Sequence, residues 1–356
     1  MQLDSIVKDG YFYQVSSTDK ANNIAKLCLL SCLEAFFRTA DELEPFYGNP
    51  NCDNTDQNVV DALYPRTYAK DSCDAILKFQ MFIELFLKDI LMEIDPMLVY
   101  DANRMPTVLY KLIRKESVCD ADLEKTKLIE CSDAIDRFQE LFRNGHVSTQ
   151  YQFVYDNVDL LRKLNTLRNR IVHRGAFILR PTAFNELFGA YIIPFLDKLE
   201  SLDPYKDVLN WNIFLNNPDI DIYRDLQAEY KLCSPNETKV HLLKKMGAAA
   251  YRNEIKNWNL PFLRQYYEEK RRIAEKKASV VAQESWCDVD NCPVCGCNTF
   301  IIETETYDEE DEDGNVINYY SYVYETKCTN CGFHINSHWI GKIKESGLPL
   351  KDYGAI

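Results

Sequence analysis

DSCDAILKFQMFIELFLKDILMEI, residues 71–94, has the strongest helical pattern in this chain. Its apolar side chains recur every three or four residues and cover most of the circumference of a helix, and Pro96 ends the pattern shortly afterwards. A helix that is apolar around most of its surface has to be covered by other helices. The sequence therefore predicts that residues 71–94 run through the middle of a helical bundle.

Four later segments repeat the helical spacing, and short polar connections between such helices favour antiparallel neighbours. They comprise residues 106–114, 132–143, 152–172 and 182–202. A helix is also expected within residues 18–46, where Ser17, Thr18 and Asp19 offer an N-cap, and the Asn-, Asp- and Pro-rich residues 47–65 predict a loop. The predicted class for this part is mainly α, an antiparallel helical bundle.

The sequence pattern changes in the second half of the chain. Residues 203–236 are mixed and predict no particular architecture, whereas residues 237–285 are mostly helical in pattern, interrupted at Pro261, and dense in lysine and arginine. Because glutamates are interleaved with these cations, we expect a solvated helical arm crossed by salt bridges. The glutamates are Glu254, Glu268, Glu269 and Glu275.

From Trp286 onward the pattern is that of β-structure. Residues 300–307 and 316–326 alternate and are rich in Ile, Val, Thr and Tyr, which predicts a hairpin with an acidic turn at residues 308–315. Four predicted segments follow: an N-terminal helical element and loop (1–66), a helical bundle (67–205), a mixed segment with a basic helical arm (206–285), and a small C-terminal β domain (286–356).

Two cysteine pairs in the last segment have the spacing of a metal site. Cys292 and Cys295 form one pair, Cys328 and Cys331 the other, and a glycine follows each pair. Two such pairs hold one tetrahedral Zn²⁺, so the segment resembles a zinc ribbon. Four thiolates leave no open position on the metal, so we expect structural rather than hydrolytic zinc.

The surroundings of this site leave two questions open. Cys287 and Cys297 lie nearby, either as free thiols or as substitutes for one of the four ligands. Aromatic residues could stack on a base or pack on a protein partner, and the acidic residues 308–313 repel phosphate, which favours a protein contact or simple support of the bundle. These aromatic residues are Phe333, His334, His338, Trp339, Tyr319, Tyr320, Tyr322 and Tyr324.

Composition limits the classes of function. The chain has 356 residues, 46% of them hydrophobic and 27% charged, and a formal net charge of −14. An acidic chain is not a general polyanion binder, so any contact with nucleic acid has to be local. Residues 1–10 lack the apolar core of a signal peptide, and no window approaches the roughly 20 apolar residues that cross a bilayer. The expected location is the cytoplasm, with no membrane partner.

Arg168-Asn169-Arg170-Ile171-Val172-His173 lies at the end of the predicted helix 152–172 and is the strongest functional signal. Helical spacing places Leu160, Leu164, Leu167 and Ile171 on the core face. Asn169 and His173 then lie nearly opposite, with Arg168 on the flank. An arginine fixes a cation for phosphate, and a histidine moves protons near neutral pH. The alternative is that these cations only complement the negative end of the helix dipole.

A site on an outward face is open to water, whereas phosphoryl chemistry gains from a water-poor cleft. A two-fold dimer in which both copies of this face meet would supply the missing wall. The sequence therefore predicts a homodimer.

On these residues, the region 71–202 resembles a HEPN domain, a helical fold found in many bacterial toxins and antiviral ribonucleases. The signature of that family is an arginine, four to six residues, then a histidine, often with a polar residue directly after the arginine. Arg168, Asn169 and His173 match it, and Glu84 and Lys88 match the acidic and basic residues embedded in an apolar helix of the family.

The resemblance implies a metal-independent endoribonuclease that uses the 2′-hydroxyl and leaves a 2′,3′-cyclic phosphate. His173 would move protons, Arg168 would stabilise the charge on the phosphate, and Asn169 would orient either group. Arg170 and Arg174 are either helpers that bind substrate phosphates or plain solvated charges. A toxin or antiviral effector of this kind also implies a regulatory protein or antitoxin.

Two other classes of function remain open. One is a non-catalytic HEPN-like module that binds a nucleotide or a protein, with the zinc ribbon as its docking surface. The other is a transcription- or translation-associated scaffold led by the ribbon, which the acidic charge disfavours.

Overall fold

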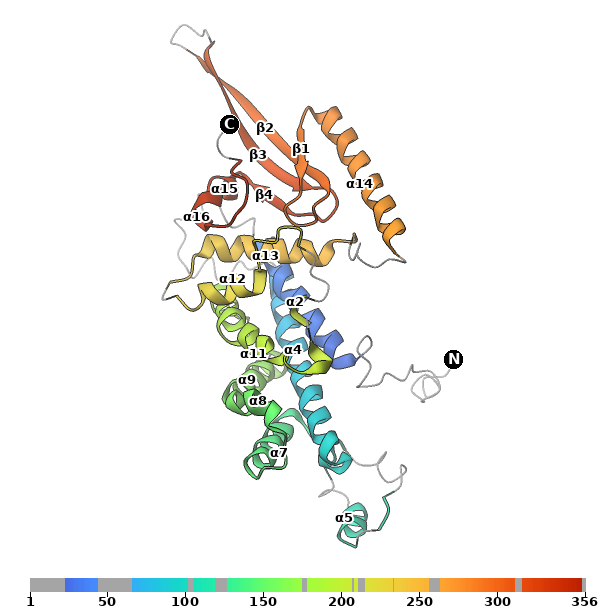
Figure 1. The fold of residues 1–356 in the computed structure, drawn as a ribbon. Coiled ribbons are helices and arrows are strands. Elements are labelled where there is room, and N and C mark those ends of the chain that lie inside the picture. The colour runs from blue at the N-terminus through green and yellow to red at the C-terminus, as the bar shows by residue number, and fades with distance from the viewer. Residues whose placement is uncertain are drawn as a thin grey trace. The chain divides into compact units, whose positions relative to one another are not determined.

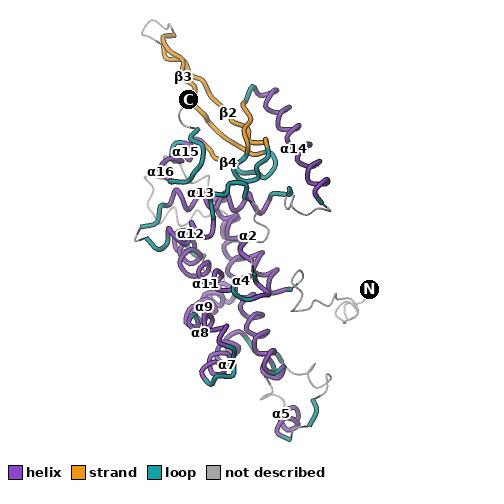
Figure 2. The backbone as a smooth tube through the Cα atoms, in the orientation of Figure 1, coloured by secondary structure: helices purple, strands orange, loops and turns teal. Residues whose placement is uncertain are grey.

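The computed structural model of the protein describes residues 23–43, 66–101, 106–114, 116–118, 127–174, 178–206, 208–210, 215–232, 234–255, 263–310 and 316–353. The predicted loop at 47–65, Pro261 and residues 311–315 of the predicted turn lie outside these ranges. The described part is mainly helical and ends in a small antiparallel sheet (Figures 1 and 2), which confirms the predicted fold class. None of its helices combines the length and the apolar character needed to cross a membrane.

The chain forms two compact units, each drawn from three separate stretches. The first unit takes its described residues from Met1–Cys32, Cys73–Ile178 and Asp197–Val208, and the second from Leu33–Ser72, Leu179–Leu196 and Leu209–Ile356. The helices α2 (Ile24–Leu43) and α4 (Arg66–Ile94) contribute residues to both units. The four segments predicted from the sequence are consecutive, whereas the units are not.

The first unit is a set of helices around the buried face of α4. Its other helices are α5 (Pro106–Ile113), α7 (Cys131–Arg143), α8 (Gln152–Asp156) and α9 (Val158–Arg174). The helix α7 packs on α8 and α9. From α4, the ring of Phe86 meets those of Tyr151 and Tyr205 edge-on, with centroids 6.2 and 5.5 Å away. The sequence predicts one helix over 152–172, but the chain turns at Asn157, whose Nδ2 donates to the Phe153 carbonyl at 2.7 Å.

The second unit contains the remaining helices, except that Asp197, Lys198 and Leu199, which end the last helix before residue 200, belong to the first unit. The helix α10 (Pro181–Glu186), a π-helical turn (Leu187–Ile192) and α11 (Ile193–Leu199) follow directly on one another, and α12 (Ile222–Glu229), α13 (Glu237–Arg252) and α14 (Arg264–Ser285) come later. Its core is aromatic, because Phe36 of α2 stacks on Phe188 with centroids 4.2 Å apart. Phe37 meets Tyr223 of α12 edge-on at 5.6 Å.

The sheet of the second unit has the strand order β1-β2-β3-β4, and all neighbours are antiparallel. The strands are β1 (Asp288–Asn291), β2 (Asn298–Glu310), β3 (Val316–Cys328) and β4 (His334–Asn336), followed by the short helices α15 (Ser337–Ile340) and α16 (Ile343–Ser346). The strands β2 and β3 form the predicted hairpin, with Phe300 opposite Cys328 and Tyr307 opposite Tyr320. The helix α14 packs along β1 and β2 (Figure 1).

Candidate functional site

Four cysteine sulfurs converge at the base of the hairpin. Cys292 and Cys295 lie between β1 and β2, Cys328 ends β3, and Cys331 lies in the turn that follows. All four are buried, and their Sγ atoms lie within 4.8 Å of one another. The Sγ atoms of Cys292 and Cys331 are 3.6 Å apart, as are those of Cys295 and Cys328. A tetrahedral ion about 2.3 Å from each sulfur separates the sulfurs by about 3.8 Å, so these residues could hold one metal ion.

Each cysteine pair forms a tight turn that ends in glycine. Gly296 and Gly332 have φ angles of 70° and 72°, in the left-handed region that favours glycine. Their amides donate to the carbonyls of Cys292 at 2.8 Å and Cys328 at 3.0 Å, which closes both turns. A Cβ atom on Gly296 would also lie 2.4 Å from the side chain of Asn216. The sequence signal of a glycine after each pair therefore has a backbone cause.

Two arginines from preceding helices hold these turns. Arg271 of α14 donates to the Gly296 carbonyl at 3.1 Å. Arg252, the last residue of α13, donates to the carbonyls of Cys331 and of the glycine after it, both at 3.4 Å, and also pairs with Asp41. Part of the predicted basic arm is thus structural support for the cysteine turns.

The chemistry of the sulfurs also fits a cation. Burial raises the pKa of the Cys292 thiol, whereas hydrogen bonds from neighbouring thiols, led by that of Cys292, lower the pKa of Cys295. A divalent ion would stabilise all four thiolates together. The spare cysteines are not in the cluster, since Cys297 donates to the Cys295 carbonyl at 3.7 Å and Cys287 donates to the Ser285 carbonyl at 3.4 Å.

The aromatic residues predicted as a contact surface divide into three groups, of which the first, His334 and His338, is half-buried. Phe333 and Trp339 are buried inside the second unit, where Phe333 stacks on Phe300 with centroids 5.9 Å apart. The four predicted tyrosines of β3 are exposed. Tyr307 of β2 joins them, because its ring stacks on Tyr320 at 5.1 Å and meets Tyr322 edge-on at 6.2 Å. The hydroxyls of these two partners donate to Glu309 at 2.8 Å and to Glu305 at 2.5 Å, respectively.

The Arg/His motif lies at the C-terminal end of α9 in the first unit. Arg168 is half-buried, and its Nη1 donates to Asn169 Oδ1 at 2.9 Å. Asn169, Arg170 and His173 are exposed, and the side chain of Arg174 lies outside the described residues. No hydrogen bond joins His173 to Arg168 within the described part of the chain.

The buried stripe of α9 is rotated from the predicted one. Sequence periodicity places the core face at Leu160, Leu164, Leu167 and Ile171. The buried residues are instead Val158, Leu161 and Leu164. Arg168 continues this stripe at helical spacing, and at about 100° per residue it lies about 140° around the axis from His173. One copy of α9 therefore does not present both side chains on the same face.

Arg168 lies near a polar cluster in the core of the first unit. In α4, Lys88 Nζ is 2.6 Å from Glu84 Oε1, and Gln80 donates to Glu84 Oε2 at 3.3 Å. Burial raises the pKa of the Cys131 thiol to about 11, and the charges of Glu84, Lys88 and Arg168 act on that thiol. Glu84 and Lys88 thus form an i,i+4 ion pair on α4, and Arg168 is a third charge that acts on the Cys131 thiol.

Sequence patterns missed two buried lysines of α13. Lys244 and Lys245 are 2% and 1% exposed, although the predicted basic arm implies that they are solvated. His241 of the same helix is also buried and stacks on Trp339 with centroids 4.1 Å apart. The sequence does contain a sign that these residues are buried: apart from them, residues 240–250 are all apolar or small.

The chain was compared with known proteins at three levels. No protein family, no curated protein and no solved structure matches it. Its function is therefore inferred from its own residues.

Proposed function

We propose that this protein is a metal-independent endoribonuclease of the HEPN type, acting on RNA as a homodimer in the cytoplasm. The observation that supports this proposal most is the end of α9. There the half-buried Arg168 donates to Asn169 Oδ1, and His173 is exposed five residues further on. An anchored cation and an accessible imidazole are the two groups that RNA transesterification needs.

The chemistry follows from these two groups. A neutral His173 would take the proton of a 2′-hydroxyl, whose oxygen then attacks the adjacent phosphorus. The 5′-oxygen leaves with a proton, and the products carry a 2′,3′-cyclic phosphate and a 5′-hydroxyl. Arg168 would stabilise the charge that builds on the phosphate, and Arg170 and Arg174 would bind neighbouring phosphates. DNA would be spared because it has no attacking hydroxyl.

Arg168 and His173 lie on different faces of α9, so a dimer is needed to bring an arginine and a histidine to one phosphate. Since Arg168 and His173 of one copy lie about 140° apart, we propose that Arg168 of one protomer and the partner's His173 act on the same phosphate. Such a nuclease endangers its own cell. Its activity therefore has to be controlled, which fits a toxin or antiviral effector that a regulatory protein or antitoxin inhibits.

Cleavage of total RNA in a buffer with EDTA tests this proposal. The wild type should cut RNA, and Arg168→Ala and His173→Ala should each lower the rate by at least about a hundredfold. Arg162→Ala is the matched control, because Arg162 lies on the same helix but pairs with Asp136 and Gln139. Equal cleavage by all four proteins, or cleavage by none, would remove the nuclease proposal.

We also propose that the ion held by the four cysteines is Zn²⁺ and that it is structural. Four thiolates with sulfur spacings of 3.6 Å are typical of zinc, and such a site has no position left for a substrate. The role of the ion would be to join the turn before β2 to the turn after β3. All the cysteines that the structure describes are free of disulfides, which suits a reducing compartment.

Metal analysis of the purified protein tests the zinc proposal. We expect one zinc per chain in the wild type and in Cys297→Ser, and much less than one in Cys295→Ser and Cys328→Ser. Cys297 is a close control, because it is as buried as the four proposed ligands and lies only two residues from Cys295. Loss of zinc in Cys297→Ser alone would contradict the assignment of ligands.

A second candidate function is a non-catalytic module that docks a protein through the ribbon. The exposed cluster of Tyr307, Tyr320 and Tyr322 favours it, because two carboxylates already bonded to tyrosine hydroxyls flank the rings. Rings and carboxylates together suit an arginine-rich peptide and repel phosphate. Binding of a labelled arginine-rich peptide should weaken in Tyr307→Ser and persist in Tyr266→Ser, whose exposed ring lies on α14. Binding of RNA oligonucleotides in place of the peptide would count against this candidate.

A further inference from the structure

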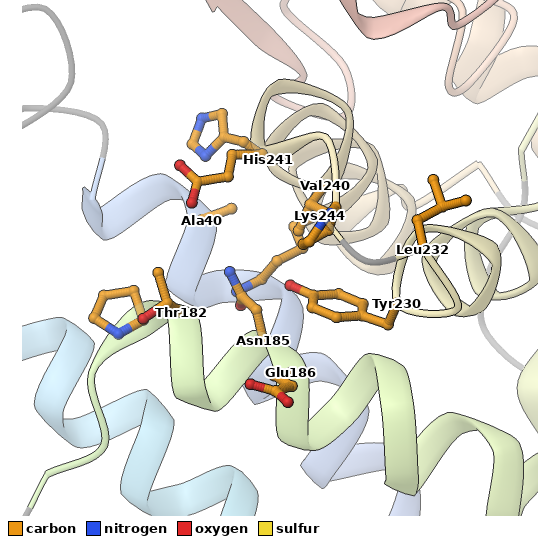
Figure 3. A pocket seen from close by; sticks show the side chains of 12 residues that line it. Ala40, Thr182, Asn185, Glu186, Tyr230, Leu232, Val240, His241 and Lys244 are labelled. Atoms are coloured by element: carbon orange, nitrogen blue, oxygen red, sulfur yellow. The ribbon is translucent and has the colours of Figure 1, made fainter.

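A cavity of about 250 Å³ lies in the second unit, lined by residues of α2, α10 and α13 and of the chain after α12 (Figure 3). Its apolar wall includes Ala40, Leu232 and Val240, and Tyr230 closes one side. The amine of Lys244, from α13, meets the amide of Asn185 in the middle of the view in Figure 3. The cavity therefore contains a nucleophilic group that the proposed ribonuclease does not use.

The hydrogen bonds of Lys244 suit an uncharged amine. Its Nζ donates to Asn185 Oδ1 at 2.6 Å and to Thr39 Oγ1 at 2.7 Å. It also lies 4.6 Å from the ring centroid of Phe36 and 5.5 Å from that of Phe184. A neutral amine has two N–H groups, which these two acceptors satisfy, and it keeps a lone pair. An ammonium has a third N–H, and no third hydrogen bond of this amine is found among the described residues, although the faces of Phe36 and Phe184 would favour a cation.

Burial acts in the same direction. It lowers the pKa of Lys244 from 10.5 to about 7, and the charge of Asp41 on α2 opposes this only in part. The other charged or titratable groups that line the cavity are Glu186 of α10, Glu237 and His241 of α13, and Tyr230. At neutral pH a large fraction of Lys244 is thus unprotonated, which is the form that attacks carbonyl groups.

We propose that this cavity is a site where Lys244 forms an imine with a small uncharged aldehyde or ketone. The Nζ lone pair attacks the carbonyl carbon, and proton transfer to oxygen gives a carbinolamine. The carbon–oxygen bond then breaks, and water leaves with the carbonyl oxygen and both amine hydrogens. The sum is amine plus carbonyl giving imine plus water, so no oxidant or reductant is required.

The residues that line the cavity favour a small uncharged carbonyl compound. Two carboxylates at the cavity, Glu186 and Glu237, disfavour a phosphate or a carboxylate ligand. The apolar wall favours a short carbon chain or a small ring, and the volume excludes anything much larger. The π-helical turn directly after Glu186 is a further sign of function, because such turns are frequent at functional sites.

Reductive trapping of the intact protein tests the proposal. The protein is incubated at pH 7 with acetaldehyde or benzaldehyde and sodium cyanoborohydride, and modified lysines are mapped by mass spectrometry. Lys244 should react at least about tenfold faster than the exposed lysines, because those are almost entirely protonated at this pH. Lys245 is the internal control, since it is equally buried but does not line the cavity.

Two variants complete the test. Lys244→Met should lose the fast reaction, and Thr182→Trp should slow it by filling the mouth of the cavity from an exposed position without touching the amine. Added inorganic phosphate should give no protection. The proposal is overturned if Lys244 of the folded wild type reacts no faster than exposed lysines, or if Thr182→Trp reacts as fast as the wild type.

Discussion

Gly247 of α13 packs directly against the ring of Phe37, a side chain with no solvent exposure. A Cβ atom at this position would lie 2.2 Å from Phe37 Cδ1. Alanine is favoured over glycine in a helix by about 1 kcal/mol, but forced overpacking of a core costs about 1–3 kcal/mol. We expect Gly247→Ala to lower the free energy of unfolding in urea, by up to about 2 kcal/mol. Gly341→Ala, with no atom within 4 Å, is the neutral control.

Lys244 should make stability depend on pH. Its folded pKa of about 7 lies below the ordinary 10.5, so between these values the unfolded chain binds more protons and stability rises with pH. The penalty for burying the amine is full below about pH 7 and is gone near pH 10.5. From pH 7 to 9 the wild type should gain about 2 kcal/mol in urea unfolding that Lys244→Met does not gain. Lys276→Met, at an exposed position of α14, should keep the gain.

Single residues were predictable from the sequence where local spacing decides their role. The four cysteine ligands need only two short turns, and the pattern of each pair contains its turn. Lys244 and Arg168 were different, because the burial of a lysine and the rotation of a helix against its neighbours depend on residues distant in sequence, such as Thr39 for Lys244. A lysine is ordinarily solvated, and the apolar run 240–250 is the local sign that this one is buried.

At the scale of elements, the end of α13 supports the second cysteine turn. Removing the Arg252 side chain leaves two backbone carbonyls of that turn without their guanidinium, so the turn should open more often. We expect Arg252→Ala to release zinc to a chromophoric chelator roughly tenfold faster than the wild type. Arg264→Ala, which removes only an exposed pair with Glu268 on α14, should leave the rate unchanged. Identical release from both variants would show that Arg252 does not support the turn.

Helices with a strong apolar period were predicted within a few residues, as α4 and α7 show. The helix predicted over 152–172 is divided at Asn157 because an asparagine side chain competes for a backbone carbonyl of the preceding turn. The strand β1, with the sequence DVDN, carries no β signal and exists because β2 pairs with it beside the cysteine turn. Both differences come from contacts that periodicity does not contain.

At the scale of the whole molecule, the proposed nuclease requires two copies. Light scattering should give the mass of a dimer for the wild type and for both alanine variants. When Arg168→Ala and His173→Ala chains are unfolded together and refolded as a mixture, half of the dimers should be mixed, and each mixed dimer has one complete cross-protomer site. Cleavage should recover to about a quarter of the wild-type rate. No recovery would mean that each site uses an arginine and a histidine from the same chain.

The helix α13 connects two places with different chemistry. Lys244 at the cavity and Arg252 at the second cysteine turn are eight residues apart, so about 12 Å of one rigid rod separates them. If binding of the proposed carbonyl compound shifts α13, the Arg252 guanidinium moves with it. Thermodynamic reciprocity then requires that the carbonyl compound changes the affinity of the four cysteines for a metal ion by the same factor as the metal ion changes the affinity for the carbonyl compound.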